Sequence, residues 1–346
     1  VLERNSEKLF APASVTKLFS TATALDALGA DHRFRTPVHY RGKLSAVANH
    51  KEAADVVKVR ELIAQADVLV EAYRPGVMAR LGLGWNDVRE LNPRLVYASL
   101  TGFGQTGPNA QVPGHDINYV AASGVAAISG DPDGPPGAGI GLPVADLVGA
   151  TYALAAINAA LLQRERSGRG QHLDVSITDC LAHWMNPRLA VFHHNHVTDA
   201  QEQRRMALSR AAYGVFRCAD GRYLSIAALE DHFWKSLVRV FGLVPFDALE
   251  YEHHAARHAK AHAINARIEE AVSALTLDEA MRLCSDADIP AMPVVVPAAL
   301  PDSGHVGTRE LVLCGLASVP ILSAPWSFLI CLRPLATYSS AVCQST

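Results

Sequence analysis

The chain has 346 residues, of which 49% are apolar and 19% are charged, and its formal net charge is −3. This length allows two domains with their own cores, and the composition is that of a globular protein. Because the net charge is negative, the composition indicates no positively charged surface for nucleic acid, and we expect no nucleic-acid partner. Six cysteines without paired spacing indicate neither a disulfide framework nor a metal knuckle, which favours a reducing, cytoplasmic location.

The first segment, residues 1–50, carries Ser14 and Lys17 in an S-x-x-K pattern. On a helix this spacing places the hydroxyl and the amine on one face, where a neutral lysine can accept the serine proton. Residues 9–42 resemble the N-terminal segment of the D-alanyl-D-alanine carboxypeptidases. That family also needs S-x-N and K-T-G patterns, and neither follows in this chain. We therefore interpret the segment as an inert fragment, with a serine acylase as the alternative.

Residues 51–195 alternate helical and strand patterns, which predicts an α/β domain with a doubly wound parallel sheet. Gly- and Pro-rich stretches at 102–114 and 130–141 are expected to be loops that approach a ligand closely. The predicted helices are residues 55–65, 85–91 and 149–166. The predicted strands are residues 67–71, 94–100 and 172–177.

Three further segments complete the chain. Residues 196–212 are polar and irregular, which predicts a linker. Residues 213–310 predict a smaller α+β domain, because Asp220 and Gly221 separate two strand-like runs, a helix follows at 231–241, and Thr276 and Glu279 form a capping box. Residues 311–346 form an apolar tail that we interpret as a foreign extension. A membrane span at 311–332 is the alternative, which Pro320 and Pro325 weaken.

Several short motifs recur in order along residues 54–310, and together they resemble CoA-transferase family III, in particular its α-methylacyl-CoA racemase-like branch. The motifs are Tyr-Arg-Pro-Gly-Val (73–77), Arg-Leu-Gly-Leu-Gly (80–84), Thr-Gly-Phe-Gly-Gln-Thr-Gly-Pro (101–108), Gly-His-Asp-Ile-Asn-Tyr (114–119), Ala-Asp (145–146), Ser-Gly-Arg-Gly-Gln (167–171) and Ala-Leu-Glu (228–230). The resemblance implies a CoA-binding α/β domain whose N-terminal unit is missing here. It also implies an interlocked homodimer, which the altered ends of this chain put in doubt.

His115 and Asp146 are the expected catalytic pair. An imidazole with a reference pKa of ~6.5 can give or take a proton near neutrality. Asp146 is expected to cap the long helix, whose N-terminal N–H groups would hold a thioester oxygen as it gains charge. The resemblance implies that both residues are acid/bases in the racemase branch, and that Asp146 is a nucleophile in the transferases.

The remaining expected site residues come from the resemblance. Glu230 matches the position that pairs with the histidine, although an acid at a helix N-terminus is the structural alternative. Arg74 and Arg80 match positions that contact CoA, and guanidinium groups suit phosphate oxygens. Gly114, Asp116 and Tyr119 are expected to contribute to the same ligand site.

The predicted function is an acyl-CoA racemase or epimerase of lipid metabolism that removes and returns the proton alpha to a CoA thioester. The alternatives are a CoA-transferase that uses an aspartyl intermediate and an inactive chimeric chain. CoA enters as part of the acyl-CoA substrate, with no tightly bound cofactor and no membrane partner. His254, His258 and His262 would share one helix face near Glu250, but a solvated face is favoured there over a metal site.

Overall fold

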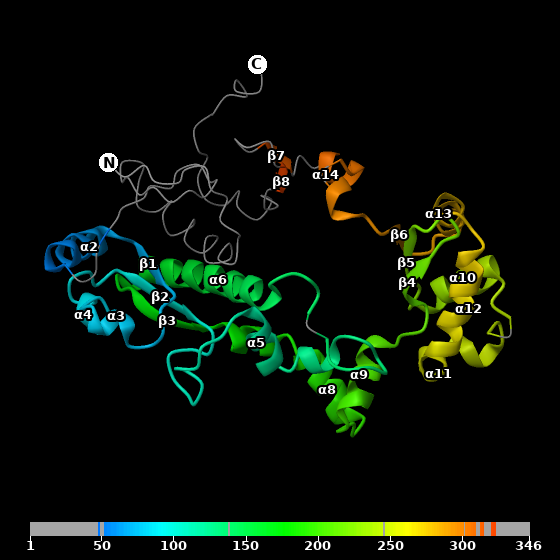
Figure 1. Cartoon of the computed structure of the whole chain (residues 1–346), viewed down its shortest axis with the longest axis horizontal. Helices are drawn as coiled ribbons and strands as arrows, with labels where there is room; N and C mark the ends of the chain where they lie inside the picture. The colour runs from blue at the N-terminus through cyan, green and yellow to red at the C-terminus, as the bar shows by residue number, and fades with distance from the viewer. Residues whose placement is uncertain are drawn as a thin grey trace, which may run out of the picture. The chain divides into compact units, whose positions relative to one another are not determined.

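The computed structural model describes residues 48, 52–137, 139–244, 246–300, 302–308, 312–314 and 320–322. The chain divides into two compact units, residues 1–210 and 211–346 (Figure 1). The S-x-x-K pair of Ser14 and Lys17 lies outside the described residues.

A three-stranded parallel sheet organises the first unit. Its strands are β1 (Val68–Glu71), β2 (Val96–Thr101) and β3 (Gln171–Ser176), in the order β1-β2-β3. Val96 lies opposite Val68 on one side and Gln171 on the other. Every residue of β2 is buried, as expected for a central parallel strand. The predicted strands and the parallel sheet are confirmed.

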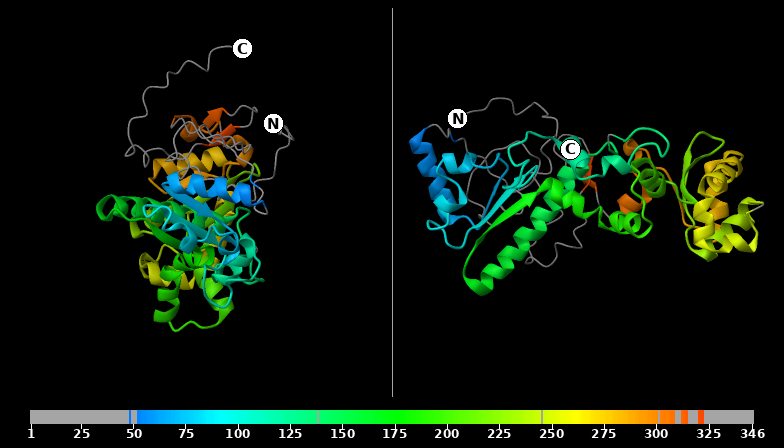
Figure 2. Two further views of the ribbon diagram at one scale, coloured as in Figure 1. Left: turned by 90° about the vertical axis from the view of Figure 1, so that its left-hand side faces the viewer. Right: turned by 90° about the horizontal axis from the view of Figure 1, so that it is seen from below.

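Helices cover both faces of this sheet. Helix α6 (Val144–Ser167) runs beside the strands in Figure 2 and packs Ile157 and Ala160 against Val96 and Ala98. Tyr97 points to the opposite face, where α2 (Ala53–Gln65) and α4 (Trp85–Val88) cover it. Successive residues of β2 point to opposite faces of the sheet, so apolar side chains from β2 pack against the helices on both faces.

Helix α6 is also long and apolar enough, by length and composition, to cross a membrane. In the structure, 39% of its most apolar stretch is buried, through contacts with β2, β3, α5 and α7. Gly149 permits one of these contacts, because a Cβ there would lie 2.8 Å from Ile177 Cγ1.

Short helices complete the first unit. They are α3 (Val77–Arg80), α5 (Asp116–Ala122), η1 (Ala126–Ile128), α7 (Ile177–His183), α8 (Asn186–His194) and α9 (Ala200–Leu208).

Helix α9 corrects one prediction, because residues 196–212 were expected to be an irregular linker. Asp199 caps the helix by accepting a 2.8 Å hydrogen bond from the Glu202 N–H. The buried Arg204 donates to the carbonyl oxygens of Ala127 and Gly134. The residues of α9 have high helix propensity, so the local composition favours the helix, and the contacts of Arg204 hold it to a remote loop that a sequence pattern does not reveal.

The second unit is an antiparallel sheet covered by helices. β4 (Tyr213–Arg217) pairs with β5 (Tyr223–Ala227), as the Asp220-Gly221 turn predicted, and β5 also pairs with β6 (Ala291–Pro293). Its core includes Leu224, Trp234, Leu237, Ile264 and Ile268. The helical elements are α10 (Asp231–Phe241), η2 (Leu249–Glu252), α11 (His254–Ala259), α12 (Ala261–Ser273), α13 (Leu277–Asp286) and η3 (Pro297–Ala299).

The predicted capping box at α13 is confirmed, since Thr276 and Glu279 exchange hydrogen bonds there. After it come α14 (Gly304–Thr308) and a pair of short antiparallel strands, β7 (Val312–Cys314) and β8 (Pro320–Leu322). The described part of the apolar tail therefore contains paired strands, which the sequence pattern did not predict.

Candidate functional site

The 102–114 loop is closed around the ring of Tyr119. A Cβ on Gly102 would lie 2.3 Å from this ring, and one on Gly114 would lie 2.7 Å from it, so both positions need glycine. The Tyr119 hydroxyl donates to the Gly114 carbonyl at 2.6 Å, and Phe103 packs edge-on against the ring. Tyr119 is 8% exposed, so it fixes the loop from inside rather than presenting a surface to a ligand.

His115 follows this loop as the N-cap residue of α5. Its backbone N–H donates to Asn118 Oδ1 at 3.0 Å, and its carbonyl accepts from the Asn118 N–H at 2.8 Å. Its backbone is extended (φ −127°, ψ 176°) and its imidazole is exposed and forms no capping bond. The backbone is therefore fixed, while the ring remains accessible for proton transfer.

Asp116 connects the His115 segment to the helix that carries Asp146. Its Oδ1 accepts hydrogen bonds from the backbone N–H groups of Ala145 and Asp146, at 2.8 and 3.0 Å. One carboxylate oxygen thus satisfies two N–H groups in the first turn of α6 and complements the positive end of the helix. Asp116 was expected to contribute to the ligand site, and in this structure it connects the two candidate catalytic segments.

The position of Asp146 differs from the prediction. Asp146 is the third residue of α6, and Pro143 occupies the N-cap position. The other early N–H groups are also satisfied, because Val144 donates to the Leu142 carbonyl and Leu147 to the Pro143 carbonyl. The expectation that this helix end holds the thioester oxygen is therefore wrong for this structure, since Asp116 and these carbonyls occupy its donors.

Electrostatic contacts show which candidates are near one another. Burial, and next the negative charge of Asp146, raise the pKa of Tyr119. Arg74 acts on the same hydroxyl in the opposite direction, and Asp116 acts in the same direction as Asp146. The charges of Asp146, Arg74 and Asp116 therefore all act on the Tyr119 hydroxyl.

The two arginines flank a turn at the end of β1. Arg74 and Arg80 are exposed, and the Arg74 carbonyl accepts the Val77 N–H at 3.1 Å. Gln111 donates to the Pro75 carbonyl at 3.0 Å, which ties the Gly-rich loop to this turn. Both guanidinium groups can therefore meet an anionic ligand beside that loop.

Glu230 belongs to the second unit, where it is the N-cap residue of α10. Its side chain is exposed and makes no capping hydrogen bond, while its carbonyl accepts from the Trp234 N–H at 2.9 Å. The position matches the structural alternative of an acid at a helix N-terminus, yet the carboxylate itself does not cap the helix.

Sequence reasoning missed two residues that shape the loop. Asp174 on β3 accepts the Gln105 N–H through both carboxylate oxygens, at 3.0 and 3.1 Å. Thr178 donates its hydroxyl to the Gly102 carbonyl at 2.7 Å. Asp174 alternates with apolar residues in its strand, and this was the available signal that it faces a polar site.

A further polar cluster lies at the sheet surface under Trp85. The Ser99 hydroxyl and His172 Nε2 share a 3.0 Å hydrogen bond, and the His172 ring stacks on Trp85 with centroids 5.9 Å apart. Burial lowers the pKa of His172. Ser99 is 2% exposed, so this pair does not present a nucleophile to a substrate.

The histidine series differs from the expected single helix face. Helix α11 ends at Ala259 and α12 begins at Ala261, with Lys260 between them (φ −114°, ψ 15°). His258 and His262 therefore lie on different helices. Among the described residues, no three histidine, cysteine or acidic side chains gather closely enough to hold a metal ion.

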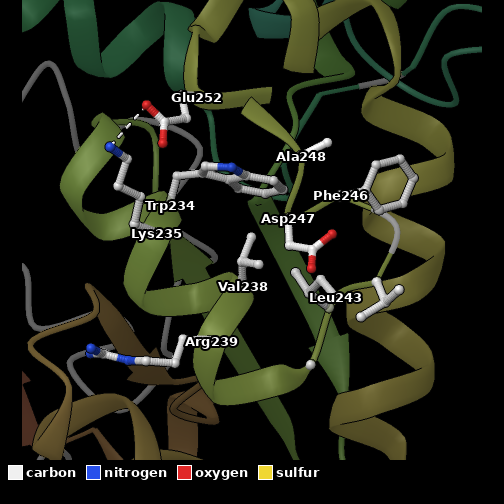
Figure 3. A pocket seen from close by; sticks show the side chains of 11 residues that line it. Trp234, Lys235, Val238, Arg239, Leu243, Phe246, Asp247, Ala248 and Glu252 are labelled. Carbon is white, nitrogen blue, oxygen red and sulfur yellow. Dashed lines mark ion pairs between the residues drawn. The ribbon is translucent and has the colours of Figure 1, made fainter. Parts of the chain in front are cut away.

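A hollow of about 360 Å³ opens in the second unit beside α10 (Figure 3). Lys235 and Glu252 form a 3.0 Å ion pair at its edge, next to Trp234. It contains none of the residues that the sequence assigned to the site. The hollow therefore adds no candidate to the chemistry of His115 and Asp146.

Replacing Asp116 with Ala is expected to lower the free energy of unfolding by about 1–2 kcal/mol, because two N–H groups of α6 lose their acceptor. Urea denaturation followed by circular dichroism measures this loss. The matched control is Asp131→Ala, which removes the carboxylate that accepts a 2.8 Å hydrogen bond from the Asp133 N–H within an exposed loop. Equal losses in the two variants would contradict the bridging role of Asp116.

The sequence model of CoA-transferase family III matches residues 28–326. The chain belongs to CoA-transferase family III. The match is wider than the 54–310 range that carries the motifs, and it includes parts of the two end segments that we interpreted as foreign.

Relatives within CoA-transferase family III have two kinds of activity in their names. The chain is 34% identical over 275 residues to acetyl-CoA:oxalate CoA-transferase of Acetobacter aceti, covering 79% of this chain and 70% of that protein. It is 34% identical over 262 residues to succinate–glutarate CoA-transferase of Agrobacterium fabrum, covering 73% of this chain and 63% of that protein. It is 36% identical over 210 residues to human alpha-methylacyl-CoA racemase, covering 59% and 53%. These relatives are enzymes, and the chain spans about half to 70% of their length.

Solved structures of similar chains agree with this assignment. Rv3272 from Mycobacterium tuberculosis is 27% identical, with a TM-score of 0.70 over 82% of this chain and 75% of that chain. A CAIB/BAIF family protein from Brucella suis is 26% identical, with a TM-score of 0.68 over 86% and 82%.

Proposed function

We propose that the chain moves the proton alpha to the carbonyl of a CoA thioester, with His115 and Asp146 as the acid/base pair. The observation that carries the proposal is the Asp116 bridge, which joins the segment of His115 to the helix turn of Asp146 at 2.8 and 3.0 Å. An exposed imidazole and a half-buried carboxylate on two connected segments suit a carbon that is approached from opposite faces.

The chemistry is a 1,1-proton transfer. One group of the pair takes the alpha proton, and the electron pair of the C–H bond moves into the thioester as an enolate. The other group returns a proton to the opposite face of the carbon, and the thioester is restored with inverted configuration. Glu230 is proposed as a third catalytic residue. The acyl-CoA is the substrate, and its anionic end would meet Arg74 and Arg80.

The second candidate function is a CoA-transferase, which the two transferases aligned over 79% and 73% of this chain favour. In that reaction the Asp146 carboxylate attacks the thioester carbonyl and the CoA thiolate leaves, giving an anhydride. The thiolate then attacks the Asp146 carbonyl, which releases the first acid and leaves an aspartyl-CoA thioester. An acceptor carboxylate then attacks the aspartyl thioester carbonyl and displaces the CoA thiolate, giving a second anhydride. The thiolate attacks the acceptor's acyl carbon, which forms the new acyl-CoA and releases the Asp146 carboxylate.

Incubation of the full chain in heavy water with a 2-methylacyl-CoA and no acceptor acid separates these functions. We expect deuterium at the alpha carbon, measured by mass spectrometry, because a racemase exchanges this proton with solvent. If no deuterium enters but hydroxylamine traps an acyl group on Asp146, then the racemase proposal fails and the transferase holds. A folded sample with neither outcome is an inactive member of the family.

A further inference from the structure

We propose that Arg257 is a positioning residue for Glu230, and this inference rests on the proposed function of Glu230. Arg257 lies on α11 and is 1% exposed, so its charge is almost entirely removed from water. A buried guanidinium is costly unless its N–H groups are paired, which makes its partners informative.

The partners of Arg257 lie on both sides of Glu230 in the sequence. Its Nη2 donates to the Leu229 carbonyl at 2.7 Å and to Asp231 Oδ1 at 2.9 Å. Glu230 lies between these two contacts, with an exposed side chain that does not cap α10. A single nitrogen therefore holds the backbone before Glu230 and the side chain after it, and leaves the Glu230 carboxylate exposed.

The other end of the guanidinium is anchored equally well. Nη1 donates to the carbonyl oxygens of Tyr251 and Glu252, at 3.0 and 2.6 Å. The group also lies over the indole of Trp234, 5.3 Å from the ring centroid. Glu252 in turn pairs with Lys235, as Figure 3 shows, so η2 is connected to α10 from two sides. Arg257 thus connects η2 and α10 to the turn that carries Glu230.

The test removes Asp231 rather than Arg257, because loss of a buried arginine would unfold part of the unit. The Asp231 side chain is 57% exposed, so Asp231→Ala spares the core. Asp278→Ala is a matched control, since Asp278 is also a first-turn acid that accepts an arginine Nη2 at 2.9 Å and is 83% exposed.

Asp231→Ala is expected to lower kcat for alpha-proton exchange about tenfold, with KM for acyl-CoA changed less than about twofold, because a misplaced catalytic group slows the chemical step. A double-mutant cycle with Glu230→Gln separates positioning from folding. In the Glu230→Gln background, Asp231→Ala should cost less than about twofold, since both changes act on one group. Equal costs in both backgrounds would overturn the proposal.

Amide hydrogen exchange supplies a second readout that does not need activity. In the full chain, the amide of Trp234, which donates to the Glu230 carbonyl, should exchange about tenfold faster in Asp231→Ala than in Asp278→Ala, because the Arg257 contact orders this turn. Unchanged protection would overturn the inference even if the enzyme is a racemase. Absence of deuterium incorporation by the unmodified chain would instead refute the proposed function, while the amide measurement still decides whether Arg257 orders the turn.

Discussion

His115→Gln is expected to slow alpha-deuterium incorporation by about 10²–10⁴-fold, the contribution of a positioned acid/base group. Glutamine occupies a similar volume but cannot take the proton. His115 is exposed, and its capping contacts with Asn118 are made by its backbone, so the substitution should leave the fold intact. Mass spectrometry of the substrate after incubation in heavy water gives the rate, and thermal melting checks the fold.

His194→Gln is the matched control for this experiment. His194 is an exposed histidine in the last turn of α8, and we assign it no chemical role. The rate of alpha-deuterium incorporation by this variant should equal that of the unmodified chain. If His115→Gln still exchanged at the full rate, the acid/base assignment of His115 would be wrong. If acyl transfer between acids persisted in His115→Gln while exchange was lost, proton and acyl transfer would depend on different residues.

Asp146→Asn is expected to slow alpha-deuterium incorporation by about the same factor as His115→Gln, and also to stop acyl transfer. The reason is that an amide is neither a general base nor a carboxylate nucleophile. The fold should persist, since Asp146 uses its backbone N–H to bind Asp116 and an asparagine keeps that group. The loss of charge in the first turn of α6 should cost about 0.3–1 kcal/mol of helix stabilisation.

The control for Asp146→Asn is Asp179→Asn. Asp179 is likewise the third residue of its helix, α7, and its N–H is also held by an oxygen acceptor, Ser176 Oγ at 3.2 Å. Both variants lose the same charge at the same helix position, so only the chemistry of Asp146 distinguishes them. Similar activity in the two variants, measured for exchange and for transfer, would remove Asp146 from the mechanism.

The regular elements were predictable because their signals are local. Strand β2 consists mostly of apolar residues, the Asp220-Gly221 turn gives the β4–β5 hairpin, and Thr276 with Glu279 forms the cap of α13. Such patterns depend on neighbours within a few residues, so a single sequence contains them. Helix α9 was missed because its segment is polar, although Asp199 is a favourable N-cap and the residues that follow have high helix propensity.

The candidate site was predictable in its residues but not in its contacts. The sequence places His115 and Asp116 side by side, yet nothing in it reveals that Asp116 binds the N–H groups of Ala145 and Asp146. The same contact explains why the helix end has no donor left for a thioester oxygen. Asp174 was missed for a similar reason, since its bonds to Gln105 join residues 69 positions apart.

The closure of the 102–114 loop around Tyr119 has a consequence for how this family can diversify. The ring packs against Gly102 and Gly114, so the two ends of the loop are fixed together independently of the residues between them. Doubling the length of a loop with fixed ends costs only about 0.6 kcal/mol of closure entropy. Insertions at residues 106–110 are therefore inexpensive, whereas any side chain at 102 or 114 would displace Tyr119. The loop can therefore lengthen between its fixed ends while His115 stays in place.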